Sequence, residues 1–259
     1  MPRLTLSGEV VEFEVGGPIP LGRGLVPPSV RRLGDLVPVL SHPEAVEDPE
    51  RPAYFMYRGV HLPEHEPLFE EAGLRFDITV IPPRVLGEEY IKTKGHYHSR
   101  APDGLNYPEV YQVLQGKAVL LLQRPGDDPS EVEDLIAVRA FPGDAVVVPP
   151  GYGHVTINPC RETLVMANLV ASECRSDYRP FVKLRGASFH LTTSGFVRNR
   201  LYSKSPPPRV VDARAPLGFD GPLSIYELFV RRPGAWTFLT RPSALPGSST
   251  PWNLPRRTL

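Results

Sequence analysis

Two histidines two residues apart are the first place in this sequence where side chains could do chemistry together. His96 and His98 lie in the segment TKGHYH, and residues i and i+2 of a strand point to the same face, so both imidazoles are expected to enter one space. Glu109 begins the next strand-like segment, and His154 follows the turn-rich segment FPGDAVVVPPGYG. Three imidazoles and one carboxylate on rigid strands suit Fe, Mn, Ni, Co or Zn better than Mg or Ca.

The identity of the carboxylate and the coordination number are left open by the residues alone. The segment SRAPDGLNYP separates His98 from Glu109; it is loop-like and is expected to bulge at the mouth of the fold. Asp103 within it is the alternative carboxylate ligand. Four protein ligands leave positions for a substrate only on a five- or six-coordinate ion, which favours an octahedral ion over a closed tetrahedral zinc site.

These ligands need rigid elements, and the sequence is strand-like from Phe76 to Asn168. Apolar segments such as FDITVIPP, AVLLLQR and TLVMANLVA alternate with turn signals every 8–12 residues, which is typical of a sandwich or barrel. The turn at Gln115-Gly116-Lys117 is expected to close a hairpin. The 32 prolines and 22 glycines also indicate many turns and strand ends, so we predict an all-β fold of short strands.

Bulk composition excludes several classes of function. The 29 basic and 29 acidic side chains balance, which argues against a general nucleic-acid or anionic-membrane surface, although one pocket can be basic on a neutral protein. Cys160 and Cys174 are too few for a disulfide scaffold and are expected to be reduced thiols. The chain opens with no signal-like segment and has no apolar run of membrane-spanning length, so we expect a cytoplasmic protein that does not contact membranes.

The chain divides into three regions on this interpretation. Residues 1–50 form an N-terminal arm, whose clearest element is Val30–Val37 and which packs on the barrel or on a partner subunit. Residues 51–200 form the barrel with the metal site. Residues 201–259 form a C-terminal extension and tail that follow the proline-rich segment KSPPPR. The histidine motif has no second copy, so a second barrel is not expected.

The spacing of the ligands resembles the two sequence motifs of the cupin superfamily. The second motif, G-x5-P-x-G-x2-H-x3-N, is matched at every fixed position: Gly143, Pro149, Gly151, His154 and Asn158. More specifically, the chain resembles the cupin-type glucose-6-phosphate isomerases of archaea and some bacteria over roughly residues 25–200. Those enzymes share the patterns T-K-G-H-[FY]-H, E-V-Y, P-P-x-[WY]-x-H and V-R-R-L-x-D, which occur here. The resemblance implies a single cupin barrel (a jelly roll, or double-stranded β-helix).

The resemblance also implies a role for particular residues. The metal ligands would be His96, His98, Glu109 and His154. The substrate phosphate would be bound by Thr79, Thr93, Lys94 and the Gly95 amide. The sugar would be contacted by Tyr111, Tyr152 and Tyr178, with Glu109 and Tyr111 as the catalytic pair. The chain departs from the family at two positions near the sugar, where Val170 replaces a tyrosine and Ser176 replaces a histidine.

The function expected from this resemblance is a metal-dependent isomerase that interconverts glucose 6-phosphate and fructose 6-phosphate, a step of glycolysis and gluconeogenesis. We expect a homodimer whose preferred ion is Fe²⁺, with Mn²⁺, Ni²⁺, Co²⁺ or Zn²⁺ as alternatives. Proton transfer by Glu109 through an enediol and a direct hydride shift both stay open. The competing functions are a cupin dioxygenase, which needs no phosphate site, and a sugar-phosphate-binding cupin without catalysis.

Overall fold

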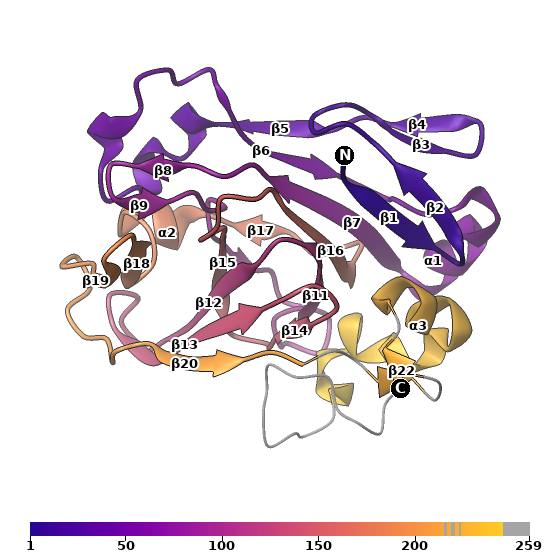
Figure 1. Cartoon of the computed structure of the whole chain (residues 1–259). Coiled ribbons are helices and arrows are strands. Elements are labelled where there is room, and N and C mark those ends of the chain that lie inside the picture. The colour runs from indigo at the N-terminus through magenta and orange to yellow at the C-terminus, as the bar shows by residue number, and fades with distance from the viewer. Residues whose placement is uncertain (215–216, 219–220, 223, 246–259) are drawn as a thin grey trace.

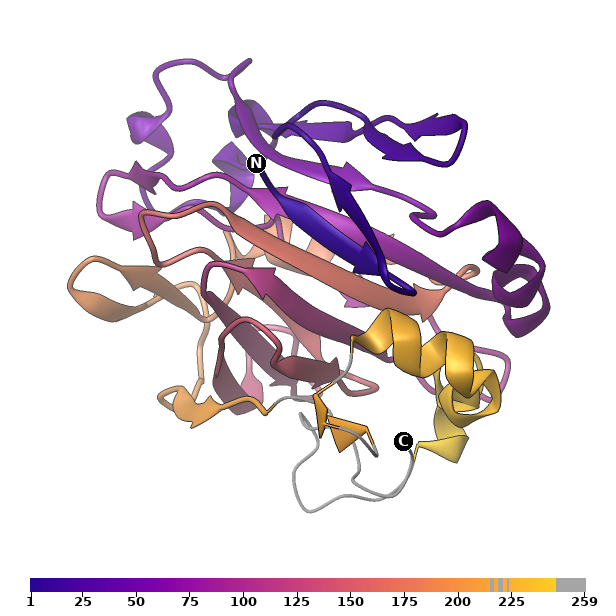
Figure 2. The same ribbon diagram turned by 45° about the vertical axis from the view of Figure 1, so that its right-hand side comes forward.

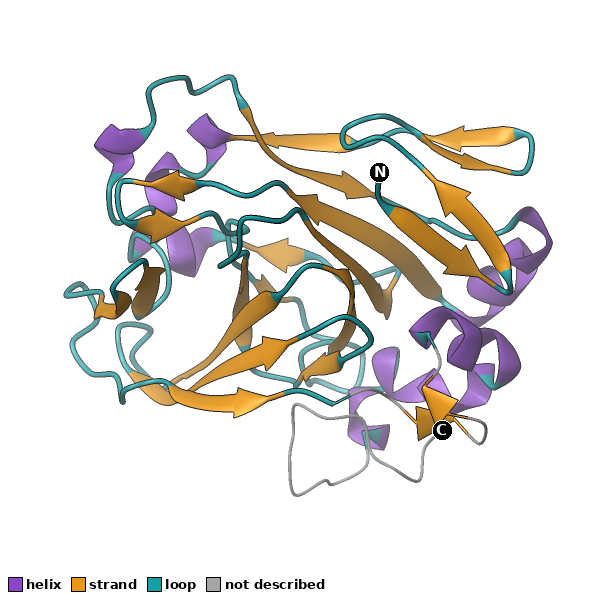
Figure 3. Cartoon of the chain, in the orientation of Figure 1, coloured by secondary structure: helices purple, strands orange, loops and turns teal. Residues whose placement is uncertain are grey.

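The computed structural model describes residues 1–214, 217–218, 221–222 and 224–245. Two sheets form its centre, and the helices lie at the margins of the strands (Figure 3). The larger sheet has the order β14-β11-β16-β7-β6-β5, with bounds Ala145–Val148, Glu109–Gln115, Leu164–Ala171, Leu74–Ile81, Pro52–Tyr57 and Ser29–Arg32. The smaller sheet has the order β15-β12-β13-β20, with bounds Gly153–Ile157, Ala118–Pro125, Val132–Ala140 and Arg209–Asp212. All neighbours pair antiparallel except β13 and β20, which are parallel.

The inner faces of the two sheets pack on each other and form one buried cluster. Tyr111 and Val113 contribute from the larger sheet, and Leu120, Leu122 and Val155 contribute from the smaller one. Alternation along each strand directs every second side chain into this space. The prediction of a single all-β cupin barrel is therefore confirmed.

The predicted hairpin at Gly116 is wrong, because β11 and β12 belong to different sheets (Figure 1). Gly116 has a φ of 78°, and a Cβ there would lie 2.9 Å from the carbonyl oxygen of Thr163. The turn thus carries the chain across from one sheet to the other instead of folding it back beside itself. The consecutive side chains of Leu120, Leu121 and Leu122 are all buried, which fits a strand covered on both faces.

The outer face of the larger sheet is covered by both ends of the chain. A second buried cluster joins Ile78 and Leu169 of the sheet to Leu4 near the N-terminus and to Phe229 and Trp236 near the C-terminus. Figure 2 shows the N-terminal hairpin and the C-terminal helix on this side of the sheet. Apolar burial of this kind contributes about 25 cal/mol per Å², so both extensions stabilise the barrel by covering it.

Short elements complete the structure. The N-terminal hairpins are β1–β2 (Arg3–Leu6, Glu9–Glu12) and β3–β4 (Ile19–Leu21, Gly24–Val26). The other strands are β8 (Val85–Leu86), β9 (Glu89–Tyr90), β10 (Tyr97–His98), β17 (Ser176–Asp177), β18 (Phe189–Thr192), β19 (Gly195–Arg198), β21 (Leu217–Gly218) and β22 (Gly221–Pro222). The α-helices are α1 (Glu66–Ala72), α2 (Arg179–Lys183) and α3 (Ile225–Arg231). Among the described residues no helix combines the length and the apolar character needed to cross a bilayer.

The predicted three-region division remains a prediction. β5 lies within residues 1–50 yet forms the edge strand of the larger sheet, so part of the N-terminal region is integral to the barrel. The last part of the predicted tail, residues 246–259, lies outside the described residues. Both cysteines are free thiols.

Candidate metal centre and its cavity

Backbone pairing brings together His96 and His154, the first and the last of the three predicted histidine ligands. His96 and His154 form an antiparallel bridge, in which the His96 amide donates to the His154 carbonyl at 3.2 Å and the His154 amide donates back at 3.0 Å. The bridge fixes the two imidazoles side by side at the inner face, with ring centroids 4.4 Å apart. Two residues 58 positions apart in the numbering thus become neighbours through the sheet and not through the sequence.

The insert before Glu109 orients His98. The Nδ1 of His98 lies 2.8 Å from the carbonyl oxygen of Tyr107, and the Asn106 side-chain amide donates to the His98 carbonyl at 2.6 Å. A hydrogen on Nδ1 leaves the Nε2 lone pair free to face the other ligands, which is the usual arrangement of a metal-binding histidine. The middle of the insert, residues 102–105, is exposed, as expected of a bulge, whereas Ala101 and Tyr107 at its two sides are buried beside Ala171.

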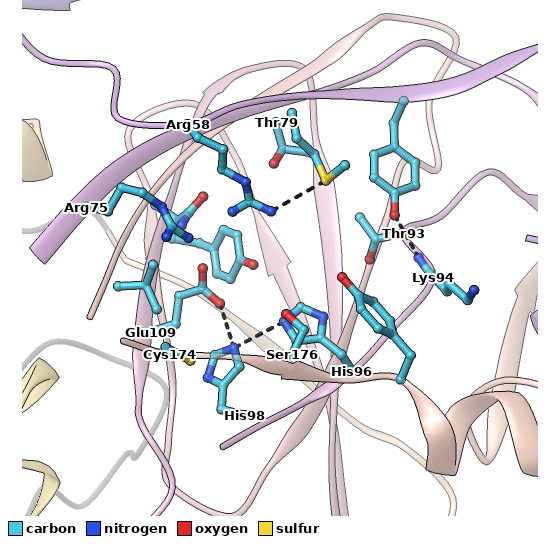
Figure 4. A pocket seen from close by; sticks show the side chains of 17 residues that line it. Arg58, Arg75, Thr79, Thr93, Lys94, His96, His98, Glu109, Cys174 and Ser176 are labelled. Atoms are coloured by element: carbon cyan, nitrogen blue, oxygen red, sulfur yellow. Dashed lines mark hydrogen bonds and ion pairs between the residues drawn. The ribbon is translucent and has the colours of Figure 1, made fainter. Parts of the chain in front are cut away.

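The four predicted ligands converge on one point. Their donor atoms all lie within 4.8 Å of one another. The Nε2 atoms of His96 and His98 are 3.2 Å apart, and Glu109 Oε2 lies 3.2 Å from His98 Nε2 (Figure 4). The same Oε2 lies 3.4 Å from His154 Nε2. Ligands bonded at about 2.1 Å to one ion are separated by roughly 3.0 Å at right angles and roughly 3.4 Å at the tetrahedral angle. The spacing suits a shared metal ion.

A buried carboxylate oxygen of the cluster lacks a hydrogen-bond donor, which also fits a bound cation. Glu109 is only 4% exposed, and its Oε2 accepts no hydrogen bond from the described residues despite the two nearby imidazoles. A buried carboxylate oxygen without a donor costs about 1–3 kcal/mol or more, and a cation among these atoms would remove that cost. Asp103, the alternative carboxylate, is exposed and accepts from the amides of Leu105 and Ser243, away from the imidazoles.

The electrostatics of the cluster favour one positive charge next to Glu109. Burial lowers the pKa of His96 well below its usual range and that of His154 to about 3, so both rings are neutral. Burial would raise the pKa of Glu109, but its contacts with His98 and His154 lower it, so the carboxylate is ionised. Burial would likewise lower the pKa of His98, but Cys174 and Glu109 raise it to about 10. A metal ion and the His98 proton would compete for the same place beside Glu109.

A cavity opens above this cluster. It is lined by Tyr54, Met56, Arg58, Arg75, Thr79, Thr93, Lys94, Gly95, His96, His98, Glu109, Tyr111, Asn168, Val170, Cys174, Ser176 and Tyr178. Of the residues predicted to bind substrate, Thr79, Thr93, Lys94, Gly95, Tyr111 and Tyr178 are therefore brought together. The two positions where the chain departs from the family, Val170 and Ser176, also face this cavity.

Tyr152 is the exception, because it is not part of this lining. Its hydroxyl donates to Asp134 at 2.6 Å, on the smaller sheet. Gly151 adopts a φ of 85° immediately before it, and β15 begins only at Gly153. The turn breaks the alternation that would otherwise direct Tyr152 to the same side as His154.

Two arginines of the cavity were missed in the sequence. Arg58 and Arg75 lie on the Glu109 side, whereas Thr93 and Lys94 lie on the opposite side (Figure 4). Arg75 could have been found, because it is four residues before Thr79 in one strand and alternation places both on the same face. Arg58 follows the last residue of β6, and no sequence pattern marked it.

Comparison with known proteins gives relatives of one kind. Residues 30–207 match the family described as glucose-6-phosphate isomerase (GPI). Glucose-6-phosphate isomerase of Thermococcus litoralis is 34% identical over 154 residues, which are 58% of this chain and 73% of the relative. Its counterpart in Thermococcus onnurineus is 30% identical over 167 residues, 63% of this chain and 82% of the relative.

A solved structure of more distant similarity shares a smaller part of the chain. Vicilin from Solanum melongena superposes with a TM-score of 0.35 at 15% identity, over 48% of this chain and 30% of that chain. This similarity is too distant to bear on the site. The family match spans well over half of the sequence, and it includes both histidine segments and Glu109. The chain belongs to the glucose-6-phosphate isomerase family.

Proposed function

We propose that this protein is a metal-dependent isomerase that interconverts glucose 6-phosphate and fructose 6-phosphate. The observation that carries the proposal is the convergence of three imidazoles and Glu109, since His96, His98 and Glu109 of this cluster line a cavity that also contains Thr79 and Thr93. Metal ligands and hydroxyl donors in one space suit a substrate with a phosphate at one end and a carbonyl at the other. Fe²⁺ is the first ion to test, followed by Mn²⁺, Ni²⁺, Co²⁺ and Zn²⁺.

The phosphate end of the substrate would be bound by the segment that precedes the histidines. Thr93 Oγ1 accepts a hydrogen bond from the Thr156 amide at 3.0 Å, which leaves its own hydrogen to donate to a phosphate oxygen. A Cβ at position 95 would lie 2.7 Å from Val155 Cγ2, so only glycine fits there, and Gly95 also lines the cavity. Lys94 Nζ lies over the Tyr178 ring, 5.6 Å from its centroid, and would add positive charge nearby.

The reacting end of the substrate would lie over Glu109 and Tyr111. The bound ion would polarise the oxygens at C1 and C2. Glu109 is ionised and would accept the C2 proton and return it at C1. The Tyr111 hydroxyl lies 3.2 Å from His154 Nε2; burial raises its pKa well above the usual value, so it stays protonated and can donate to a sugar oxygen. Incorporation of solvent deuterium at C1 would support this proton transfer, whereas product without deuterium would support a hydride shift.

The decisive assay couples fructose 6-phosphate isomerisation to a detectable product, with and without a chelator. Turnover that the chelator abolishes and added metal restores would support the proposal. His154→Ala should lose metal and turnover together, since it removes one of the four donors. Binding of the sugar phosphate without any turnover would favour a non-catalytic cupin, and oxygen uptake by the Fe²⁺-loaded protein would favour a dioxygenase.

The active form is proposed to be a cytoplasmic homodimer. β5 is an edge strand of the larger sheet, and Val30 on it is an exposed apolar side chain. Edge strands present unpaired backbone groups that a second copy can pair with or cover. Light scattering coupled to size-exclusion chromatography would measure the mass, and a monomer at all concentrations would refute the dimer.

A further inference from the structure

Strand register places Arg75 directly beside the candidate metal centre. β7, β16 and β11 are neighbours in the larger sheet, and Arg75 pairs with Val170, which in turn pairs with Glu109. All three side chains line the cavity. The next row of the same face consists of polar side chains: Asp77, Asn168 and Tyr111. A band of polar and charged groups therefore crosses the sheet next to the end of the cavity where Glu109 lies.

Asp77 holds two arginines in place within this band. It is 1% exposed, and its carboxylate accepts from Arg58 Nη1 at 2.5 Å, from Arg75 Nε at 2.8 Å and from the Gly59 amide at 3.0 Å. The two guanidinium groups and one carboxylate leave a net charge of +1. Each guanidinium has five N–H donors, and the ion pairs with Asp77 engage one nitrogen of each. The side chains of Arg58 and Arg75 remain 47% and 29% exposed, so they can reach a ligand.

Asn168 provides a second, independent indication of a ligand. Its side chain is 3% exposed and lines the cavity, yet its Nδ2 has no hydrogen-bond partner among the described residues. A buried amide donor without an acceptor costs about 1–3 kcal/mol, so a ligand oxygen at this place would stabilise the site. Val170, in the row next to it, has a short apolar side chain that leaves room for such a ligand.

We propose that Arg58, Arg75 and Asn168 form an anion-binding subsite beside the metal centre, which binds the carboxylate of a phosphorylated sugar acid. The proposal rests on the proposed function, because it takes the ligand's phosphate to lie at the opposite end of the cavity, near Thr93 and Lys94. Guanidinium groups bind planar carboxylates through paired, charge-assisted hydrogen bonds.

Two ligands that differ at one carbon test the subsite. 6-Phosphogluconate has a carboxylate at C1, and glucitol 6-phosphate has a hydroxymethyl group there; both have the same phosphate. Titration calorimetry with metal-loaded and metal-stripped protein would measure their affinities. The subsite predicts that 6-phosphogluconate binds at least about 10-fold more tightly in both forms, since a hydrogen bond to a charged group contributes enough for that ratio. A preference that vanishes with the metal would overturn the proposal, because the carboxylate would then be recognised by the ion alone.

Single substitutions can distinguish a loss of ligand recognition from a loss of folding. Arg75→Met and Arg58→Met should each reduce 6-phosphogluconate binding about 10-fold or more, with glucitol 6-phosphate binding within about 2-fold of the parent. Asn168→Leu removes the unpaired donor without disturbing the ion pairs of Asp77, so it tests the subsite even if an arginine variant fails to fold. Arg124→Met is the matched control, because Arg124 is half exposed on the smaller sheet and pairs with Glu133. Equal losses for both ligands, or losses in the control, would refute the subsite.

Turnover of fructose 6-phosphate by the same protein preparations distinguishes this inference from the proposed function. Turnover by the parent protein without an arginine-dependent carboxylate preference would refute the subsite and leave the isomerase standing. A carboxylate preference without turnover would refute the isomerase and support the subsite.

Discussion

Replacing Asn106 by alanine should weaken metal binding and leave the protein folded. Asn106 lies in the insert and donates to the His98 carbonyl at 2.6 Å, while the neighbouring Tyr107 carbonyl lies 2.8 Å from His98 Nδ1. The two contacts fix the backbone and the ring of one candidate ligand. Because Asn106 is partly exposed and does not belong to either main buried cluster, its loss should act on the ligand more than on the fold.

The expected magnitude follows from the contact that is removed. A neutral hydrogen bond contributes about 0.5–1.5 kcal/mol, which corresponds to a loss of roughly 2- to 12-fold in metal affinity if all of it is realised there. If the insert loosens and the Tyr107 contact is lost as well, the effect should reach about 10- to 100-fold, the usual cost of removing a group that orients a ligand. Competition with a chelator of known affinity would measure the dissociation constant, and circular dichroism would monitor the fold.

Asp103→Asn is the matched control for this prediction. Asp103 lies in the same insert, but its carboxylate accepts from Leu105 and Ser243 and does not contact the imidazoles. Metal affinity should therefore stay within about 2-fold of the parent, less than one hydrogen bond provides. An Asn106→Ala protein with full metal affinity would refute the orienting role of the insert, and a loss of metal in Asp103→Asn would show that the carboxylate ligand was assigned wrongly.

Three further predictions concern the substrate, the buried charges and the tyrosine outside the cavity. Thr93→Val should retain metal but raise the KM for fructose 6-phosphate by about 10-fold, because a donor to the phosphate is removed; an unchanged KM would argue against that role. Burial would raise the pKa of Glu89, but Lys92 and His190 lower it below its usual value of 4.5, so its stabilising effect is present above about pH 4.5 and is lost as the pH falls below it. Urea unfolding should accordingly show a weaker loss of stability on acidification in Glu89→Gln than in the parent, and equal slopes would contradict this. Tyr152→Phe should cost about 1 kcal/mol of unfolding free energy by loss of a hydrogen bond but leave KM unchanged, and a raised KM would return this residue to the sugar site.

The sequence was sufficient for the class of fold and for the identity of the three converging imidazoles. Turn signals between short apolar segments predicted an all-β barrel, which the structure confirms. The i, i+2 spacing of His96 and His98 and the motif that contains His154 predicted side chains that do meet within 4.8 Å. Local spacing can predict these features because a strand directs alternate residues to one face wherever it lies in the fold.

The sequence could not determine which strands pair. The turn at Gly116 looked like a hairpin, and only the crowding at the Thr163 carbonyl shows that the chain crosses between sheets there. Likewise the sequence predicted a loop in the insert but not the burial of Ala101 and Tyr107, because that burial depends on a surface formed by residues far along the chain. Pairing partners and buried surfaces are non-local, so composition and periodicity do not reveal them.

The residues around the candidate metal centre show most clearly which features the sequence determined and which depended on the tertiary structure. The sequence by itself determined that His96, His98 and His154 would be offered to one interior, because their strands and turns are encoded locally, whereas it left the carboxylate open between Glu109 and Asp103. Only the tertiary structure decided that Arg58 and Arg75 would share Asp77 beside Glu109, because that arrangement requires β6, β7, β16 and β11 to lie next to one another in register. Strand alternation is a property of a short segment, whereas the neighbours of a side chain across a sheet are set by the packing of the whole chain.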